Sequence, residues 1–192
     1  MEKRVDLSAA ALHILAMIFM LMDHLWATFL PAQEWLTCVG RLAFPIFAFM
    51  AVEGYFYTRS FKRYALRMLA FALLSEVPFD LMYSGTWFYP VHQNVIWTLL
   101  LGLLGIHVME KAREKGRQWR YVLVCAGVTV LGAALGTVGM VDYYGAGVLT
   151  VFAFYFFRGR EWWKLLGQIL TLYWLNVRLL GGQLYPISVF GA

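Results

Sequence analysis

Long apolar runs, each close to the length of a membrane-spanning helix, recur from one end of this chain to the other. A transmembrane helix needs about 20 mostly apolar residues, because only a helix or a closed barrel satisfies its backbone hydrogen bonds inside a bilayer. Charged residues make up 14% of the 192 residues, against about 25% in soluble domains. We therefore predict an all-α, polytopic membrane protein with a single transmembrane domain over 1–192, lying in an inner or plasma membrane.

The apolar runs divide into about seven helical segments separated by short hydrophilic gaps. The predicted segments are 8–30, 38–58, 64–83, 94–110, 120–139, 143–158 and 163–180. The sixth and seventh are short for a membrane span, so we expect them to be tilted or partly re-entrant. Pro45 and Pro78 are predicted to interrupt the second and third helices. Gly132 and Gly136 predict close packing of the fifth helix within the chain.

Basic residues set the predicted orientation. Fourteen of the 16 Lys and Arg residues precede the first segment or follow the second, fourth and sixth. Positive residues concentrate on the cytoplasmic side of membrane proteins, so we place the N-terminus in the cytoplasm. This pattern accounts for the net charge of +5, and we expect no nucleic-acid partner. The cysteines, Cys38 and Cys125, form no ligand set with histidines, so no metal is expected.

Ionisable and amide side chains gather at one depth, towards the outer side of the predicted bundle. They are Asp23 and His24 in the first segment, Arg41 in the second, Glu76 and Asp80 in the third, and His92 and Asn94 at the start of the fourth. Such residues are rare inside membranes and usually face a cavity with a functional role. Their shared depth predicts one polar site.

Several of these residues also have a structural explanation. Asp23 lies about 100° from His24 around the helix, so it could form a buried ion pair with Arg41. His24 could be a hydrogen-bonded packing residue. Asn94 could simply cap the fourth helix. The residues alone leave both explanations open.

Four stretches of the chain resemble the TraX family, which is named for the conjugative F-pilin acetylase, an integral membrane protein that acetylates the pilin N-terminus. The stretches are MDHLW, GRLAFPIFAFMAVEGYFYT, RMLAFALLSEVPFDL and QNVIWTLLLGLLGIHVME. The resemblance covers about residues 10 to 110 in order, and from about 120 onward only the helical pattern is similar. Family members continue to a segment resembling FYPxH, so we expect a C-terminally truncated or partial chain, or a shortened member, here.

The resemblance implies an acetyltransferase that moves an acetyl group from cytosolic acetyl-CoA to a peptide or small molecule on the outer side, such as a pilin-like N-terminal amine. His24 would be the general base or a transient acyl carrier, and Asp23 would orient it. Arg41 would hold Asp23 or stabilise an oxyanion. The residues expected to shape the acceptor pocket are Glu76, Asp80, His92 and Asn94.

The donor would bind at the opposite, inner end of the bundle. Arg63 and Arg67 would meet the phosphates of acetyl-CoA, with Glu53 nearby. The residues themselves leave other roles open for Glu53, which could face Arg59 or Lys62 or line an inner vestibule. No Gly-rich phosphate loop accompanies these residues.

Two other functions fit the same polar residues. A proton-coupled transporter would also place acidic, His and Arg residues beside proline breaks. However, MDHLW and GRLAFP have no counterpart in the second half of the chain, as an internal repeat would require. The other alternative is a non-catalytic membrane assembly protein, which the expected shortening of the chain favours.

Overall fold

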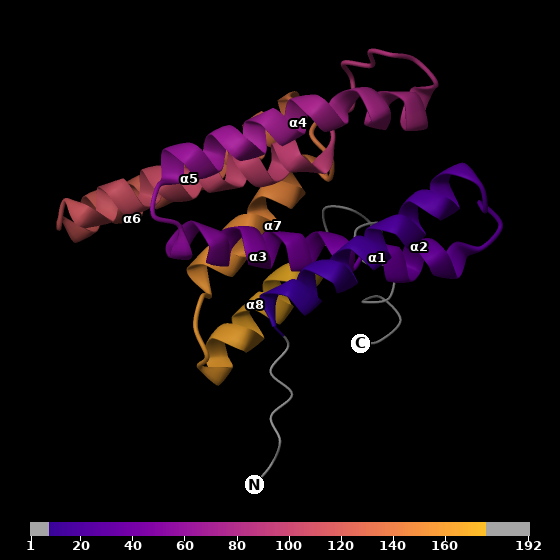
Figure 1. Ribbon diagram of the computed structural model, residues 1–192. Helices are drawn as coiled ribbons and strands as arrows, with labels where there is room; N and C mark the ends of the chain where they lie inside the picture. The colour runs from indigo at the N-terminus through magenta and orange to yellow at the C-terminus, as the bar shows by residue number, and fades with distance from the viewer. Residues whose placement is uncertain (1–7, 176–192) are drawn as a thin grey trace, which may run out of the picture.

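The computed structural model describes residues 8–175, which form an elongated bundle of eight α-helices (Figure 1). The helices are α1 (Ala9–Thr28), α2 (Glu34–Gly40), α3 (Ala43–Tyr57), α4 (Phe61–Ser84), α5 (Val95–Glu114), α6 (Gln118–Val138), α7 (Tyr144–Phe156) and α8 (Trp162–Trp174). The seven predicted segments are confirmed as helical, with the second one split into α2 and α3. The end of the seventh segment, 176–180, lies outside the described residues.

The two prolines behave differently from each other. A turn at Arg41 and Leu42 separates α2 from α3, and Pro45 follows in the first turn of α3, where the missing N–H is not needed. Pro78 lies inside α4, which continues without a break to Ser84. The predicted interruption of that helix is therefore wrong. One proline removes a single backbone hydrogen bond, and the neighbouring turns of α4 keep theirs.

Four helical stretches in the described part of the chain are long and apolar enough to cross a membrane. They are α1, the joined stretch Glu34–Tyr57, α5 and α6. The helix α7 has 13 residues, which is about 20 Å of helix against a hydrocarbon core of about 30 Å. The chain is thus a multi-pass helical membrane bundle in which α7 is short, as predicted, whereas the far end of the seventh predicted segment lies outside the described residues.

Helix α7 lies at the centre of the bundle and packs on α3, α5, α6 and α8. Ten of its 13 residues are buried. Glycines allow this close packing: a Cβ at Gly132 would lie 2.9 Å from the Phe152 ring, and one at Gly136 would lie 2.9 Å from the carbonyl oxygen of Tyr144. The predicted packing of these α6 glycines within the chain is confirmed.

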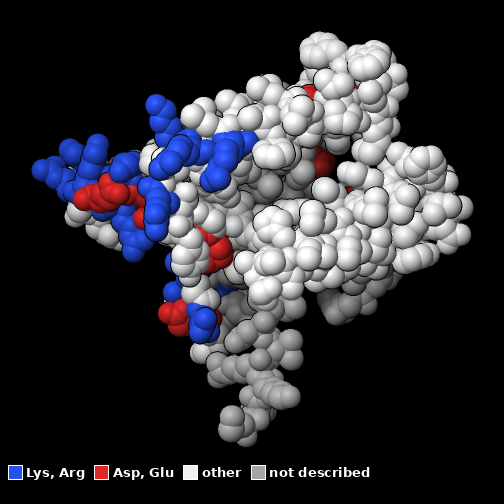
Figure 2. Space-filling view, in the orientation of Figure 1, with Lys and Arg blue, Asp and Glu red and all other residues white. Residues whose placement is uncertain are grey.

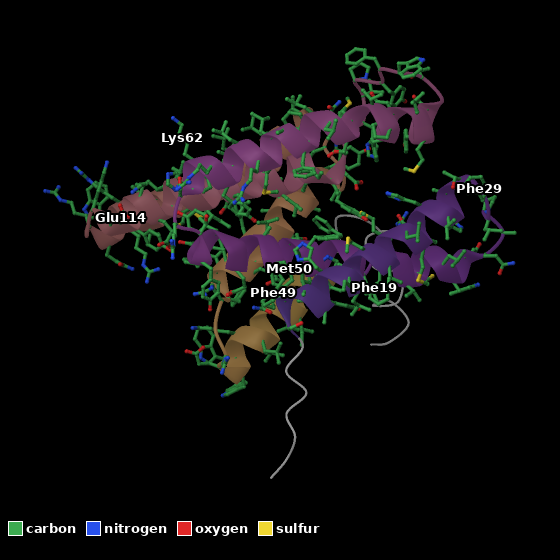
Figure 3. All side chains as sticks on the ribbon, in the orientation of Figure 1. Phe19, Phe29, Phe49, Met50, Lys62 and Glu114 are labelled. Atoms are coloured by element: carbon green, nitrogen blue, oxygen red, sulfur yellow. The ribbon has the colours of Figure 1, made fainter. Side chains whose placement is uncertain are left out.

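Charged residues are concentrated at one end of the bundle. Figure 2 shows Lys and Arg gathered at the end that carries the α5–α6 turn and the start of α4, and Figure 3 places Lys62 and Glu114 there and Phe29 at the opposite end. We call the first of these the basic end; it includes Arg59, Arg63, Arg67 and Arg158. The segregation is the one that the positive-inside rule predicts for a cytoplasmic basic end.

Candidate functional site

A cavity of about 330 Å³ lies in the half of the bundle away from the basic end. It is enclosed by the second halves of α1 and α4, the start of α3, the start of α5 and the α6–α7 turn. The walls are mostly apolar, as in most small-molecule sites. The polar lining residues are Asp23, His24, Ser75, Asn94 and Asp142.

Asp23 is held from the side by α2. The Thr37 hydroxyl donates to Asp23 Oδ1 at 2.7 Å, and Arg41 Nε lies 3.9 Å from the same oxygen. Gly40 makes this contact possible, since a Cβ there would lie 2.6 Å from the backbone nitrogen of Asp23. The structure therefore contains the Asp23–Arg41 pair, with Arg41 outside the cavity lining.

The His24 ring points into the cavity region without a hydrogen bond from any described residue. Asp23 and His24 are neighbours in sequence but face different directions around α1, because consecutive helical residues are rotated by about 100°. Asp23 turns to α2, so no hydrogen bond joins the two side chains within the described chain. Both ring nitrogens of His24 are thus available to a ligand.

Asn94 ties α5 to α4. Its side-chain oxygen accepts from the backbone nitrogen of Ile96 at 3.0 Å, which caps α5, and its amide donates to the Ala72 carbonyl at 2.9 Å and to Glu76. Trp97 Nε1 donates to Glu76 Oε2 at 2.8 Å, whereas Glu76 Oε1 is buried without a partner among the described residues. The capping role of Asn94 is confirmed, and the residue lines the cavity as well.

Asp80 stands behind the cavity face of α4 and holds the loop that leads to α5. Its Oδ2 accepts from the backbone nitrogen of Tyr89 at 2.8 Å, and its Oδ1 is buried with no partner in the described part of the chain. Glu76, Asp80 and His92 all lie outside the cavity lining. Of the four residues expected in the acceptor pocket, the structure brings only Asn94 to the cavity wall.

Asp142, in the α6–α7 turn, is a cavity residue that the sequence did not single out. Its Oδ1 lies 3.7 Å from Nε2 of His92 and accepts from the backbone nitrogen of Tyr143 at 3.0 Å. Burial raises the pKa of Asp142 to about 7; the Tyr143 bond opposes this rise, the Asp23 carboxylate adds to it and Arg41 opposes it. Burial also lowers the pKa of His92, so near pH 7 both partners tend towards their neutral forms.

The turn that carries Asp142 has an unusual backbone. Met140, Tyr143 and Tyr144 have φ values of 49°, 61° and 50°, which non-glycine residues rarely adopt and which often mark functional segments. The turn is fixed to the α4–α5 loop, since Gln93 N donates to the Met140 carbonyl and Asp142 N donates to the Gln93 carbonyl, both at 2.9 Å. An isolated acid between two apolar runs, at the depth of the other polar residues, was the signal that could have identified it.

The three residues expected to bind the donor are not together. Glu53 binds Arg158 through two hydrogen bonds, at 2.7 Å to Nε and 3.0 Å to Nη2. Of the roles that the sequence left open for Glu53, a pairing with Arg59 or Lys62 is not the one found, because Arg158, 105 residues away in sequence, lies beside it in space. Arg63 and Arg67, by contrast, line a surface recess of about 580 Å³ together with Arg59.

The lining of the cavity does not suit a metal ion. Within residues 8–175, no group of three or more His, Cys, Asp or Glu side chains could hold one. The chemistry available there is that of an imidazole, two carboxylates, an amide and the Ser75 hydroxyl.

Comparisons with known proteins place this bundle in a family. The model of the family described as TraX protein matches residues 8–188. A probable fimbrial assembly protein, FimC of serogroup H1 from Dichelobacter nodosus, is 34% identical over 119 residues, which are 56% of this chain and 49% of that protein. The chain thus spans about half the length of this curated relative, and no solved structure matches it. Because the family match covers nearly all of the bundle and extends well beyond the four motifs, this chain belongs to the TraX family.

Proposed function

We propose that this chain is an integral membrane acyltransferase, in which an amine held in the cavity attacks the thioester of acetyl-CoA. One observation carries the proposal: the His24 imidazole, unbonded within the described chain, lines a cavity that also holds two carboxylates. An imidazole is the side chain best suited to accept a proton near neutral pH. The family resemblance to a pilin acetylase supports the same reaction.

His24 acts as the general base of the transfer. The neutral amine attacks the carbonyl carbon of acetyl-CoA, the C–N bond forms, and His24 takes the proton that the nitrogen loses. The C–S bond then breaks, and the thiolate of CoA leaves and takes up the proton from His24, which restores the neutral imidazole. Asp23 stabilises the imidazolium through space, and Arg41 positions Asp23. Asn94 and Asp142 contact the acceptor.

The donor approaches along one face of α4. Arg63, Arg67, Phe71 and Ser75 are spaced four residues apart, so they follow one face of α4 from the recess at the basic end to the cavity wall. Arg67 and Ser75 are about 12 Å apart along the helix axis. The arginines bind the phosphates of CoA at the recess, and the thioester arm extends along this face.

The direct test is acetyl transfer by the purified protein in liposomes, with labelled acetyl-CoA and amine-bearing peptides. His24→Ala should lower the rate by about 100-fold or more, which is the usual contribution of a general base. The matched control is His13→Ala, since His13 lies on the same helix outside the cavity lining and contacts Phe47 through its ring. Full transfer by a normally folded His24→Ala protein would contradict the assignment.

The name of the relative favours a second candidate, a non-catalytic protein for fimbrial assembly. Such a protein would bind a subunit in the cavity without using acetyl-CoA. Calorimetric titration of the detergent-solubilised protein with acetyl-CoA separates the two candidates, because an assembly protein should release no heat of binding. Retained binding that is lost in Arg63→Ala/Arg67→Ala would support the transferase.

A further inference from the structure

The cavity is open sideways, between α1 and α4. Within the described bundle α1 packs mainly on α2 and α3, whereas α4 packs mainly on α5. Figure 1 shows the long helices running across the view between the basic end and the opposite end, and Figure 2, in the same orientation, shows a hollow with acidic atoms at its bottom. In both figures the viewer looks at the side of the bundle, across the long helices. The opening is therefore on the side that faces the lipid, not at either end that faces water.

The rim of the opening is apolar on both sides. On α1, Met17 lies two turns before His24 on the same face and is 48% exposed. On α4, Phe71 lies one turn before Ser75 and is 62% exposed, and Pro78 is exposed next to the cavity. An apolar portal that leads to polar groups suits a ligand with an apolar part outside and a polar group inside.

The charges inside the cavity select the polar group. Two carboxylates, Asp23 and Asp142, line the wall, and no Lys or Arg side chain lines it in the described part of the chain. Arg41 reaches Asp23 from the α2 side. Asp142 lies 3.7 Å from His92, and it is also affected by the more distant charges of Asp23 and Arg41. A carboxylate in apolar surroundings attracts a cationic donor, and a primary ammonium group supplies three N–H donors. The bound ammonium then gives one proton to the Asp142 carboxylate, which leaves the neutral amine that attacks the thioester.

We propose that the acceptor is a membrane-embedded amphiphile whose primary amine enters the cavity from the bilayer, between α1 and α4, and binds Asp142. Its apolar part stays in the lipid beside Met17 and Pro78. This inference rests on the proposed acyl transfer and names the class of acceptor for the same cavity. A water-soluble amine that enters from the outer aqueous side is the competing occupant.

Photolabelling in liposomes tests the portal without any acetyl transfer. The probe is a long-chain alkyl primary amine with a photoreactive diazirine in its chain, and mass spectrometry maps the labelled residues. Label should concentrate on Met17, Met20 and Met82, and the same chain with a neutral alcohol head should label these positions at least fivefold less. Equal labelling by the alcohol, or label spread evenly to exposed α6 positions such as Val130, would overturn the proposal.

A pair of neighbouring substitutions on α1 supplies the matched control. Met17→Trp narrows the portal, whereas Ile18→Trp adds the same bulk at an equally exposed position (50% against 48%) that is rotated by about 100°. Met17→Trp should lower cavity labelling at least fivefold, and Ile18→Trp should leave it unchanged. Asp142→Asn should lower labelling by the amine to the level of the alcohol probe.

Acetyl transfer to the long-chain amine and to a short, water-soluble alkylamine separates this inference from the proposed function. The lateral route predicts that Met17→Trp slows transfer only to the long-chain amine. If labelling follows these expectations but no amine is acetylated, the transferase proposal fails and the portal stands. If the short amine is acetylated equally well and Met17→Trp changes neither labelling nor transfer, the lateral route fails alone.

Discussion

The two ends of this bundle treat polar side chains in opposite ways. At the basic end they satisfy one another: Glu53 holds Arg158 through two bonds, and Arg158 also lies over the Phe56 ring at 4.2 Å. Tyr155 donates to Glu110 at 2.6 Å and bonds to Tyr121 at 3.1 Å. Such closed networks fix the packing of the helices that they join.

Around the cavity, several polar groups are only partly satisfied. In the described part of the chain the His24 ring has no hydrogen-bond partner, and Glu76 and Asp80 each keep one buried oxygen unpaired. Native proteins leave few buried polar groups unpaired, and those that exist call for an explanation. The contrast indicates that polar groups at the basic end are matched to one another, whereas those in and behind the cavity are matched less completely, and of these only the His24 ring lines the cavity.

The largest expected effect tests the stabilising role of the basic end. Arg158→Met leaves the Glu53 carboxylate, 25% exposed, without its partner. Removing one partner of a fully buried pair costs about 3–5 kcal/mol, and partial exposure brings our expectation to about 3 kcal/mol. Thermal unfolding in detergent, followed by tryptophan fluorescence, measures it. The double variant Glu53→Gln/Arg158→Met should recover most of the loss; failure to recover it would mean that the pair is not what stabilises this end.

The next predicted change should raise the stability of the protein. It concerns Asp142, whose charged form is destabilised by burial at the cavity. A pKa of Asp142 that rises from 3.8 to about 7 corresponds to about 4 kcal/mol, and the side chain is 26% exposed, so we expect about half of that. The folded protein binds this proton more tightly than the unfolded chain, so the charged carboxylate lowers stability as pH rises from about 4 through 7.

Asp142→Asn should therefore be more stable than the wild type at pH 8, by about 2 kcal/mol, and closer to it at pH 5. The lowered pKa of His92 acts in the other direction, since stability gained from its neutral form increases with pH. His92→Gln is the control for that contribution. If the unfolding midpoints of wild type and Asp142→Asn change equally with pH, the charged Asp142 carboxylate does not destabilise the folded protein, and this prediction is contradicted.

A third prediction links packing to the cavity. Gly40→Ala places a methyl group 2.6 Å from the Asp23 backbone nitrogen, so α1 must move away from α2 at the position of the cavity. Overpacking of this kind costs about 1–2 kcal/mol, and the displaced His24 should lower acetyl transfer by about tenfold. Gly127→Ala is the control, because nothing lies within 4 Å of a Cβ at that position. Unchanged transfer by Gly40→Ala would show that the spacing of α1 and α2 does not set the cavity.

The smallest effect compares one hydroxyl at each end. Tyr155→Phe removes the bond to Glu110, and Thr37→Val removes the bond to Asp23; each should cost about 1 kcal/mol, or a few degrees in the unfolding midpoint for a chain of this size. Only Thr37→Val should lower acetyl transfer, because only that bond fixes a residue of the cavity. Equal rates for the two variants would remove the functional distinction between the ends.

Hydropathy and charge pattern were enough to predict the helical segments and the charge asymmetry, and they suggested the Asp23–Arg41 pair as one of two explanations. The pair was predictable because one short turn joins the two helices, so nearby positions at equal depth must meet. Asp23, His24 and Asn94 could be proposed from the sequence for a related reason. A polar group within or beside an apolar run has few environments that it can occupy.

Contacts between distant segments could not be predicted in this way. Glu53 and Arg158 are 105 residues apart, and nothing in their local sequence links them. The depth of Asp142 could have marked it as a candidate, but its place in the cavity wall depends on a turn that folds back against Gln93. Glu76 and Asp80 lie behind the cavity face of α4 rather than on it. Their directions depend on the rotation of α4, and this rotation follows from a helix that continues through Pro78 without interruption.

The shortness of α7 has a consequence for how the protein is made. A 13-residue apolar helix is too short to partition stably into a bilayer by itself, yet its neighbours bury it almost completely. It must therefore enter the membrane against helices that the ribosome has already delivered, with α3, α5 and α6 in place before it. The order in which the helices enter the membrane therefore matters for the assembly of this bundle. A nascent chain released before α7 would have a groove where the finished protein has its central helix.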